Sequence, residues 1–558
     1  MSVTDTATPS QIPANKRWGM VVDLNRCVGC QTCTIACKHA NDTLPEVQWR
    51  RVLDVELGSF PDVERLFLVT GCQHCEEPPC VPVCPTGATA QRADGLVTMD
   101  YDLCIGCSYC AVSCPYQART IVHDHKWYFG KETAQEKAVE HPDRIGVMSK
   151  CTFCVSRIDD SYEKGQTPGV DNDVTPACAA SCIAQALHFG DYNDPNSNVS
   201  TLTKGNKTFK MHEQLGTKPQ INYIYDLPNS MPGREATEDE TGDEVYGDAS
   251  HALTGKRQTF WDWKGATNFI LGGMGSGVII MAWLGSVTGV VNAAVLPSIN
   301  TLGAAIMAVG LLTLLFKIGK PMRILNALRR PQSSWMTREM YIAAVFYAAM
   351  ALTVLPYVLS VPLWSAGVVS MLNGAVALLA LGFLYAQAQI LFAAKGIPAW
   401  RAPLIPWMLF ASGLFEGLGL LAIIYAAMSS VIISDPLLAG VGALLAGANF
   451  SLWVSYRQRA KIVGIGPLAR QDLAGITPGL AFAGHAVPFA LFIGAQLVPA
   501  MNIPAVYAVA GIGVLFGGWL WKLTVITKAC HQQGFAVPRL PQRGSGTRAA
   551  PARMGLKT

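Results

Sequence analysis

The chain has 558 residues, of which 50% are hydrophobic and 15% are charged, whereas soluble domains carry charges on about a quarter of their residues. Its length exceeds that of one compact core, and its net charge of +4 is too weak to indicate a nucleic-acid partner. Of the 17 cysteines, 16 lie before residue 183. The composition therefore excludes a single soluble enzyme domain and indicates two parts of different character.

The N-terminal segment is polar and contains neither an apolar signal-peptide core nor an Arg-Arg pair. We therefore predict a disordered tail over 1–16 and no export signal, which leaves the cysteine-rich part in the cytoplasm. In that reducing compartment, clustered cysteines are expected to bind metal rather than to form disulfides.

The cysteines before residue 183 form four groups. The groups are Cys27, Cys30, Cys33 and Cys37; Cys72, Cys75, Cys80 and Cys84; Cys104, Cys107, Cys110 and Cys114; and Cys151, Cys154, Cys178 and Cys182. The first and third groups have the C-x2-C-x2-C-x3-C spacing of bacterial ferredoxins, in which the fourth cysteine ligates the other cluster of a pair. Structural zinc uses similar CxxC pairs, usually two pairs across a long spacer. Four quartets favour iron–sulfur clusters. Cys530 stands alone, and we interpret it as incidental.

The remainder of the chain changes character twice. Residues 201–260 are predicted to be a linker, in which 231–250 carries seven acids and one arginine and is expected to be a mobile or surface strap. Eight apolar runs follow, each long enough to span a bilayer, a succession that buried core helices do not explain. They are 265–289, 291–316, 339–359, 363–394, 404–428, 433–456, 477–498 and 505–526.

The charges of the connections give an orientation. Before the first span and after the second, fourth, sixth and eighth spans lie 22 lysines and arginines, with Lys522 counted in the tail. The four alternate connections contain none, so the positive-inside rule predicts that both termini and the cysteine domain lie in the cytoplasm. The predicted division is a cluster domain over 17–200, the linker, a membrane anchor over 261–528 and a basic cytoplasmic tail over 529–558.

Few polar groups lie within the spans. Glu416 and His485 are predicted to lie deep in the membrane, where ionisable groups are costly and usually functional. We interpret both as part of a quinone site or its proton path, with a neutral group hydrogen-bonded between helices as the alternative. Further quinone-site candidates are Asn268 in the first span and Arg323, Trp335 and Arg338 at the cytoplasmic end of the spans. The alternative for the arginines and the tryptophan is that they anchor the topology. The glycines of 272–277 are predicted to allow close helix packing. His485 is the single histidine of 265–526 and no CxxCH motif occurs, so no haem is expected.

Several motifs resemble a known family. CVGCQTCTIACK, CQHCEEPPCVPVCPTGA, CIGCSYCAVSCPYQAR and KCTFC resemble the four-cluster electron-transfer subunit of complex iron–sulfur molybdoenzymes of the DMSO reductase family, over about 17–200. FWDWKGATNFILGGMGSG and KIGKPMRILNALRRPQSSWMTRE resemble the NrfD/DmsC-type membrane anchor of the same complexes. The resemblance implies a ferredoxin-like α+β dicluster domain followed by an all-α eight-helix transmembrane bundle. It also implies four [4Fe–4S] clusters on the ligand sets Cys27/Cys30/Cys33/Cys182, Cys151/Cys154/Cys178/Cys37, Cys72/Cys75/Cys80/Cys114 and Cys104/Cys107/Cys110/Cys84.

The resemblance further implies a function. The chain would be non-catalytic alone and would transfer electrons between a molybdenum or tungsten bis-pterin subunit, docked in the cytoplasm, and ubiquinone or menaquinone in the bacterial inner membrane. The cytoplasmic placement favours oxidation of a substrate such as phenylacetyl-CoA or sulfite, coupled to quinone reduction. The alternatives are a subunit of a DMSO or polysulfide reductase, a hydrogenase-linked electron conduit and a redox-driven ion-translocating membrane protein.

Overall fold

The structure is a computed structural model that describes residues 12–59, 62–134, 136, 144–225, 245–361, 363–428, 431 and 435–537. The chain divides into two compact units, each of which is described by itself. The first comprises Met1–Lys256 with Gln532–Thr558, and the second comprises Arg257–His531.

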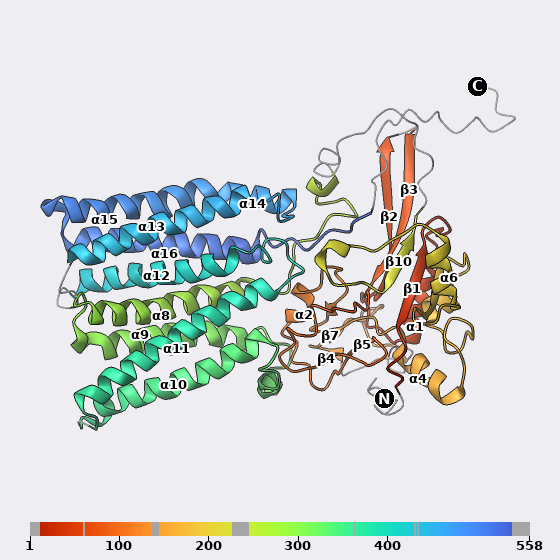
Figure 1. Ribbon diagram of the computed structural model, residues 1–558, viewed down its shortest axis with the longest axis horizontal. Helices are drawn as coiled ribbons and strands as arrows, with labels where there is room; N and C mark the ends of the chain where they lie inside the picture. Colours follow the sequence, from red (N-terminus) through yellow and green to blue (C-terminus); the bar gives the residue numbers. More distant parts are fainter. Residues whose placement is uncertain are drawn as a thin grey trace. The chain divides into compact units, whose positions relative to one another are not determined.

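The first unit is an α+β domain with many short elements. In chain order they are β1 (Trp18–Asp23), α1 (Thr32–Ala40), β2 (Arg50–Ser59), β3 (Asp62–Gly71), β4 (Thr89–Gln91), β5 (Val97–Met99), α2 (Tyr109–Val112), β6 (Thr120–Ile121), β7 (Met148–Ser149), α4 (Val155–Lys164), α5 (Ala177–Ala180), β8 (Leu187–Asp191), α6 (Asn198–Gly205), β9 (Thr208–Phe209), η3 (Glu213–Leu215) and β10 (Ile221–Ile224). A four-stranded sheet has the order β8-β1-β10-β9, and β2–β3, β4–β5 and β6–β7 form three separate two-stranded antiparallel sheets. Figure 1 shows β2 and β3 as one long hairpin.

Strand β1 lies inside the sheet and is buried on both faces. Met20 and Val22 belong to the main core of the unit, whereas Val21 packs with Val199 of α6 on the other face. Burial on both faces explains why the strand reads as a continuous apolar run rather than an alternating one.

The cluster domain extends beyond the boundary that the sequence predicts. Strand β10 pairs in parallel with β1, and β9 pairs with β10, so the first part of the expected linker over 201–260 is sheet. All four residues of β10 are buried. A four-residue strand is too short to show a periodic pattern, which is why the prediction was wrong here.

Two further segments of the first unit pack together. The Phe535 amide donates to the Leu253 carbonyl at 2.8 Å, the Gln532 amide donates to the Lys256 carbonyl at 2.9 Å, and the Leu253 and Phe535 side chains enter the core. The start of the expected tail over 529–558 is therefore ordered through main-chain pairing. Residues 538–558 and most of the acidic segment (231–244) lie outside the described residues.

The second unit is a helical bundle (Figure 1). Within the described residues, eight helical segments are long and apolar enough to cross a membrane. The helices and short turns are α8 (Trp263–Val287), η4 (Ala293–Val295), α9 (Leu296–Leu315), η5 (Pro321–Leu328), α10 (Trp335–Leu359), α11 (Ala366–Ala393), α12 (Ile405–Ala427), α13 (Asp435–Gln458), α14 (Pro467–Gly479), η7 (Leu480–Ala486), α15 (Val487–Leu497), η8 (Pro499–Met501) and α16 (Pro504–Thr527). Helix α14, the π-helical turn η7 and helix α15 together form the seventh span.

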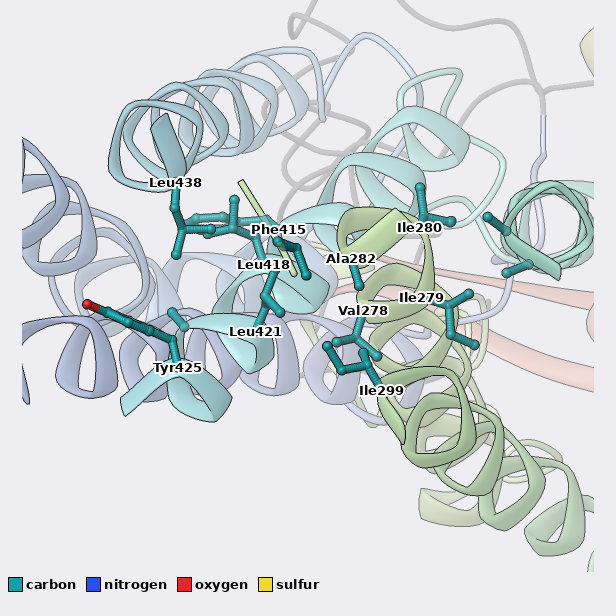
Figure 2. Close-up of a cluster of buried hydrophobic side chains, with 14 of the residues drawn as sticks. Val278, Ile279, Ile280, Ala282, Ile299, Phe415, Leu418, Leu421, Tyr425 and Leu438 are labelled. Carbon is teal, nitrogen blue, oxygen red and sulfur yellow. The ribbon is translucent and has the colours of Figure 1, made fainter. Parts of the chain in front are cut away.

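Helices α8, α12 and α16 form the centre of the bundle. More than half of the apolar window of each is buried, against 22–39% for the other five spans. A Cβ on Gly277 of α8 would lie 1.9 Å from the Gly413 carbonyl oxygen of α12, so these two helices touch through their backbones. This contact confirms the packing role predicted for the glycines of 272–277. Figure 2 shows Val278, Ile299 and Leu418 in one core cluster that joins α8, α9 and α12.

Two details differ from the sequence prediction. The seventh span begins at Pro467 rather than at 477, because the more polar segment 467–476 continues the helix. Lys522 lies inside α16 with a side chain that is 1% exposed, so counting it in the basic tail was wrong.

Candidate functional site

The cysteine loops share a backbone conformation that wraps the chain around a point. Gly29 and Gly106 occupy the same position in two Cys-x2-Cys loops and have φ of 69° and 70°. Gln31 and Ser108, two residues later, have φ of 62° and 63° and precede helices α1 and α2. A Cβ on Gly29 would also lie 2.5 Å from the Phe67 ring. Left-handed residues in such loops turn successive amides toward one concave side, which suits an anionic ligand.

Two quartets of cysteines each line a cavity. The first cavity is lined by Cys72, Cys75, Cys80 and Cys114. The second cavity is lined by Cys84, Cys104, Cys107 and Cys110. Both combine three thiols from one group with the last cysteine of the neighbouring group. This exchange is the arrangement of paired ferredoxin clusters.

The remaining eight cysteines form two further sets by proximity. Cys27 and Cys33 interact electrostatically with Cys182, and Cys37 interacts with Cys151, Cys154 and Cys178. Amides point at several of the sulfurs: Ala186 donates to Cys182 Sγ at 3.3 Å and Phe153 donates to Cys151 Sγ at 3.4 Å. These amides would stabilise sulfur ligands that carry negative charge.

The four sets follow one another in a row. Cys33 of the first set interacts with Cys178 of the second, Cys151 with Cys72 of the third, and Cys110 of the fourth with Cys80 of the third. All cysteines of the two middle sets are buried, whereas Cys30 is exposed and Cys27, Cys182 and Cys107 are half-buried. The first set therefore reaches the surface, the fourth set approaches it only at Cys107, and the two middle sets are enclosed.

The chemistry of this donor set fits iron–sulfur clusters. Burial raises the pKa of Cys33 and of Cys114 to about 11 and that of Cys110 to about 12. Such thiols become thiolates only beside a strong positive charge, and iron provides that charge. The ligand loops, the two lined cavities and the amides directed at sulfur all agree with [4Fe–4S] ligation.

An ion pair lies within the membrane helices. The Lys522 ammonium on α16 donates to Glu416 Oε2 on α12 at 2.8 Å, and the two residues are 1% and 2% exposed. Lys522 also donates to the Phe269 carbonyl of α8 at 3.3 Å. A Cβ on Gly518 would lie 2.1 Å from Glu416 Oε1, and a Cβ on Gly273 would lie 2.5 Å from Lys522 Nζ. Two glycines therefore make room for the pair.

The sequence pointed to Glu416 but not to its partner. The available signal was a single lysine within the apolar run GGWLWKLTVIT of the last span. The prediction instead counted Lys522 among the basic residues of the tail, although it lies within the predicted span 505–526.

The other candidates in the spans lie around the same three helices. Asn268 of α8 is buried and its Oδ1 lacks a hydrogen-bond partner in the described part of the chain, while its carbonyl accepts from Gln387 Nε2 of α11 at 3.0 Å. His485 is buried in the π-helical turn η7 between the rings of Phe415 and Phe450, and its Nδ1 lies 2.9 Å from the Leu480 carbonyl. Such turns often mark functional sites.

Two of the candidates at the start of α10 lie together. Arg338 stacks on the Trp335 ring at 4.3 Å and donates to the carbonyls of Pro331 and Gln332. Arg323 lies in the preceding turn, η5. Glu339 of α10 is not among the candidates that the sequence predicts. It is 2% exposed, and its Oε1 has no hydrogen-bond partner among the described residues. The available signal was an acidic residue at the first position of the predicted span 339–359. Helix α10 begins earlier, at Trp335, which places Glu339 one turn inside the span.

These features define a class: a multi-pass membrane protein with an iron–sulfur domain. Residues 63–131 match the 4Fe-4S dicluster domain family, and residues 268–476 match the family described as DMSO reductase anchor subunit (DmsC). The chain belongs to the family of iron–sulfur electron-transfer subunits of complex iron–sulfur molybdoenzymes, with a DmsC-type anchor on the same chain.

Curated relatives resemble part of the chain. A subunit of the selenate reductase of Mesobacillus selenatarsenatis is 39% identical over 226 residues, which are 38% of this chain and 73% of that protein. A subunit of the sulfite dehydrogenase of Allochromatium vinosum is 39% identical over 221 residues, 37% of this chain and 81% of that protein. The iron–sulfur cluster-binding subunit of menaquinone reductase of Nitratidesulfovibrio vulgaris is 36% identical over 226 residues, 37% of this chain and 88% of that protein.

Proposed function

We propose that this chain carries electrons through four [4Fe–4S] clusters between a molybdopterin catalytic subunit and a membrane quinone. The observation that supports this most directly is the row of four cysteine sets with buried middle sets and more accessible ends. The ligands are Cys27/Cys30/Cys33/Cys182, Cys37/Cys151/Cys154/Cys178, Cys72/Cys75/Cys80/Cys114 and Cys84/Cys104/Cys107/Cys110. When bound, the clusters supply one-electron transfer, and the protein holds them in sequence and shields the inner two from water.

The catalytic partner is a separate molybdenum or tungsten bis-pterin subunit that docks on the iron–sulfur unit. The relatives support such an assembly, since they are named as subunits of selenate reductase, sulfite dehydrogenase and other oxidoreductases. Their substrates differ, so they do not select one for this chain. The basic residues in alternate connections support a cytoplasmic iron–sulfur unit and cytoplasmic termini in the bacterial inner membrane. This placement favours oxidation of a cytoplasmic substrate, such as sulfite or phenylacetyl-CoA, with reduction of quinone.

The quinone site is proposed near the ion pair of Glu416 and Lys522. Lys522 is five residues from the end of α16 at Thr527, or about 8 Å along the helix axis. The chain leaves the bundle for the iron–sulfur unit just after that helix end. On the proposed orientation the pair lies in the cytoplasmic half of the bundle, where a quinone takes up protons on reduction. The buried Oδ1 of Asn268, which has no hydrogen-bond partner among the residues that the structure describes, supplies a further polar group. The other residues proposed for the site are His485, Arg323, Trp335 and Arg338.

Purification from native membranes in mild detergent tests the proposal. We expect about 16 iron atoms per chain, one molybdenum or tungsten atom, and a large pterin-binding partner. Sixteen iron atoms with nickel instead would retain the electron conduit and reject the proposed partner. A chain with eight iron atoms or fewer would reject the four-cluster assignment.

The buried ion pair also supports a second candidate function, redox-driven ion translocation. The variant Glu416→Gln distinguishes the two functions. If the carboxylate serves the quinone site, reconstituted complex loses quinone turnover. If it belongs to a pump, quinone is still reduced while proton translocation across the vesicle membrane is lost.

A further inference from the structure

Two buried arginines lie beside the cysteine row and have no role in the function described so far. Arg50 begins β2 and is 1% exposed, and Arg119 precedes β6 and is 4% exposed. In the part of the chain that the structure describes, neither guanidinium has a carboxylate within ion-pair distance. The buried Arg92 of the same unit differs, because Asp94 and Asp159 neutralise it at 3.0 and 2.7 Å.

The surroundings of Arg119 place it between the third and fourth cysteine sets. Its Nη1 donates to Cys110 Sγ of the fourth set at 3.3 Å, and its side chain lines the cavity that the third set surrounds. Thr89 Oγ1 and Met99 Sδ lie 3.2 and 3.1 Å from the same nitrogen, and Nη2 has no hydrogen-bond partner among the described residues. The charge of Arg119 is therefore directed at sulfur.

Arg50 occupies the corresponding position between the first and second sets. It interacts electrostatically with Cys33 of the first set and with Cys37, Cys151 and Cys178 of the second. Its Nε and Nη1 are buried and lack hydrogen-bond partners in the described part of the chain. Arg119 likewise interacts with Cys110 of the fourth set and with three cysteines of the third. Each arginine thus serves one pair of neighbouring sets.

A [4Fe–4S] cluster with four thiolates is a dianion that becomes a trianion on reduction. A fixed positive charge beside it stabilises the reduced form more than the oxidised form, and burial strengthens this effect. An unneutralised buried guanidinium is costly by itself. It becomes favourable when an anionic group lies next to it.

We propose that Arg50 and Arg119 are redox-tuning residues, each of which raises the reduction potentials of the two clusters on either side of it. The inference rests on the proposed four clusters. It assigns Arg50 to the first and second clusters and Arg119 to the third and fourth. The reduction potentials of the two clusters in each pair are therefore expected to shift together.

The test is an EPR-monitored redox titration of the complex in native membranes. The wild-type complex is measured first, because absence of four clusters there would reject the proposed function rather than this inference. The variant Arg119→Gln keeps a donor for Cys110 Sγ but removes the charge. We expect the reduced-to-oxidised ratio of the third and fourth clusters at a fixed ambient potential to fall at least tenfold, or about 59 mV for one electron. Arg50→Gln should shift the first and second clusters instead.

Two controls make the result specific. Arg119→Lys keeps the charge and should retain most of the wild-type potentials. Arg65→Gln removes a charge from an exposed ion pair with Asp54 on the β2–β3 hairpin and should leave all four potentials unchanged. If Arg119→Gln loses iron, Arg119→Met provides a second neutral side chain for the same measurement. Unchanged potentials in iron-replete neutral variants, equal shifts at all four clusters, or an equally large shift in Arg119→Lys would overturn the proposal.

Discussion

Removal of Lys522 should destabilise the membrane bundle more than an average substitution does. The variant Lys522→Met removes the ammonium that lies 2.8 Å from Glu416 Oε2. Glu416, which is 2% exposed, then has no charged partner at that atom. Loss of one member of a buried ion pair costs about 3–5 kcal/mol of unfolding free energy. We expect the lower end, about 3 kcal/mol, because the remaining carboxyl can neutralise itself by binding a proton.

The double variant Lys522→Met with Glu416→Met separates the charge effect from packing. Replacement of both charges by apolar groups of similar size is often neutral or stabilising. The double variant should therefore regain most of the lost stability, with a coupling energy of about 2–3 kcal/mol. The assay is reversible unfolding of the purified chain in mixed micelles with increasing denaturing detergent. Arg257→Gln is the control, since its ion pair with Asp472 is half exposed and should contribute less than about 1 kcal/mol.

Additive effects of the two substitutions would contradict a stabilising ion pair. If Lys522→Met costs less than about 1 kcal/mol, or if the double variant loses the sum of the two single losses, then the pair does not stabilise the bundle as an ion pair. The close approach of Gly518 and Gly273 would then reflect helix packing alone.

Two further predictions concern the bundle and the clusters. Gly277→Ala should destabilise the bundle by about 1–3 kcal/mol, because its Cβ would lie 1.9 Å from the Gly413 carbonyl oxygen. The control is Gly447→Ala, which should be tolerated because a Cβ there meets open space. Thermal unfolding in detergent compares the two variants. Cys107→Ser should remove up to about four iron atoms per chain, whereas the control Cys530→Ser should retain the full iron content. The measurement is metal analysis of the purified chain, and equal iron losses in the two variants would contradict the ligand assignment.

The sequence determined the two-part organisation because its signals are local. A Cys-x2-Cys loop binds through neighbouring residues, so its spacing is visible without tertiary information. The membrane spans are equally local, since each needs only enough apolar residues to cross the bilayer. The ends of seven spans agree with the structure within a few residues, and the early start at Pro467 differs because polar residues can continue an apolar helix.

The tertiary structure decided which distant groups meet. Lys522 reads as an end-of-span lysine until the packing of α16 against α12 places it beside Glu416, 106 residues earlier. Strand β10 has no periodic signal of its own and becomes a strand because β1 offers a partner with unpaired main-chain groups. Arg50 and Arg119 are unremarked basic residues in the sequence, and their significance follows from burial beside cysteines of different loops. Charge pairing and strand pairing depend on three-dimensional distance, which the spacing of residues along the chain does not determine.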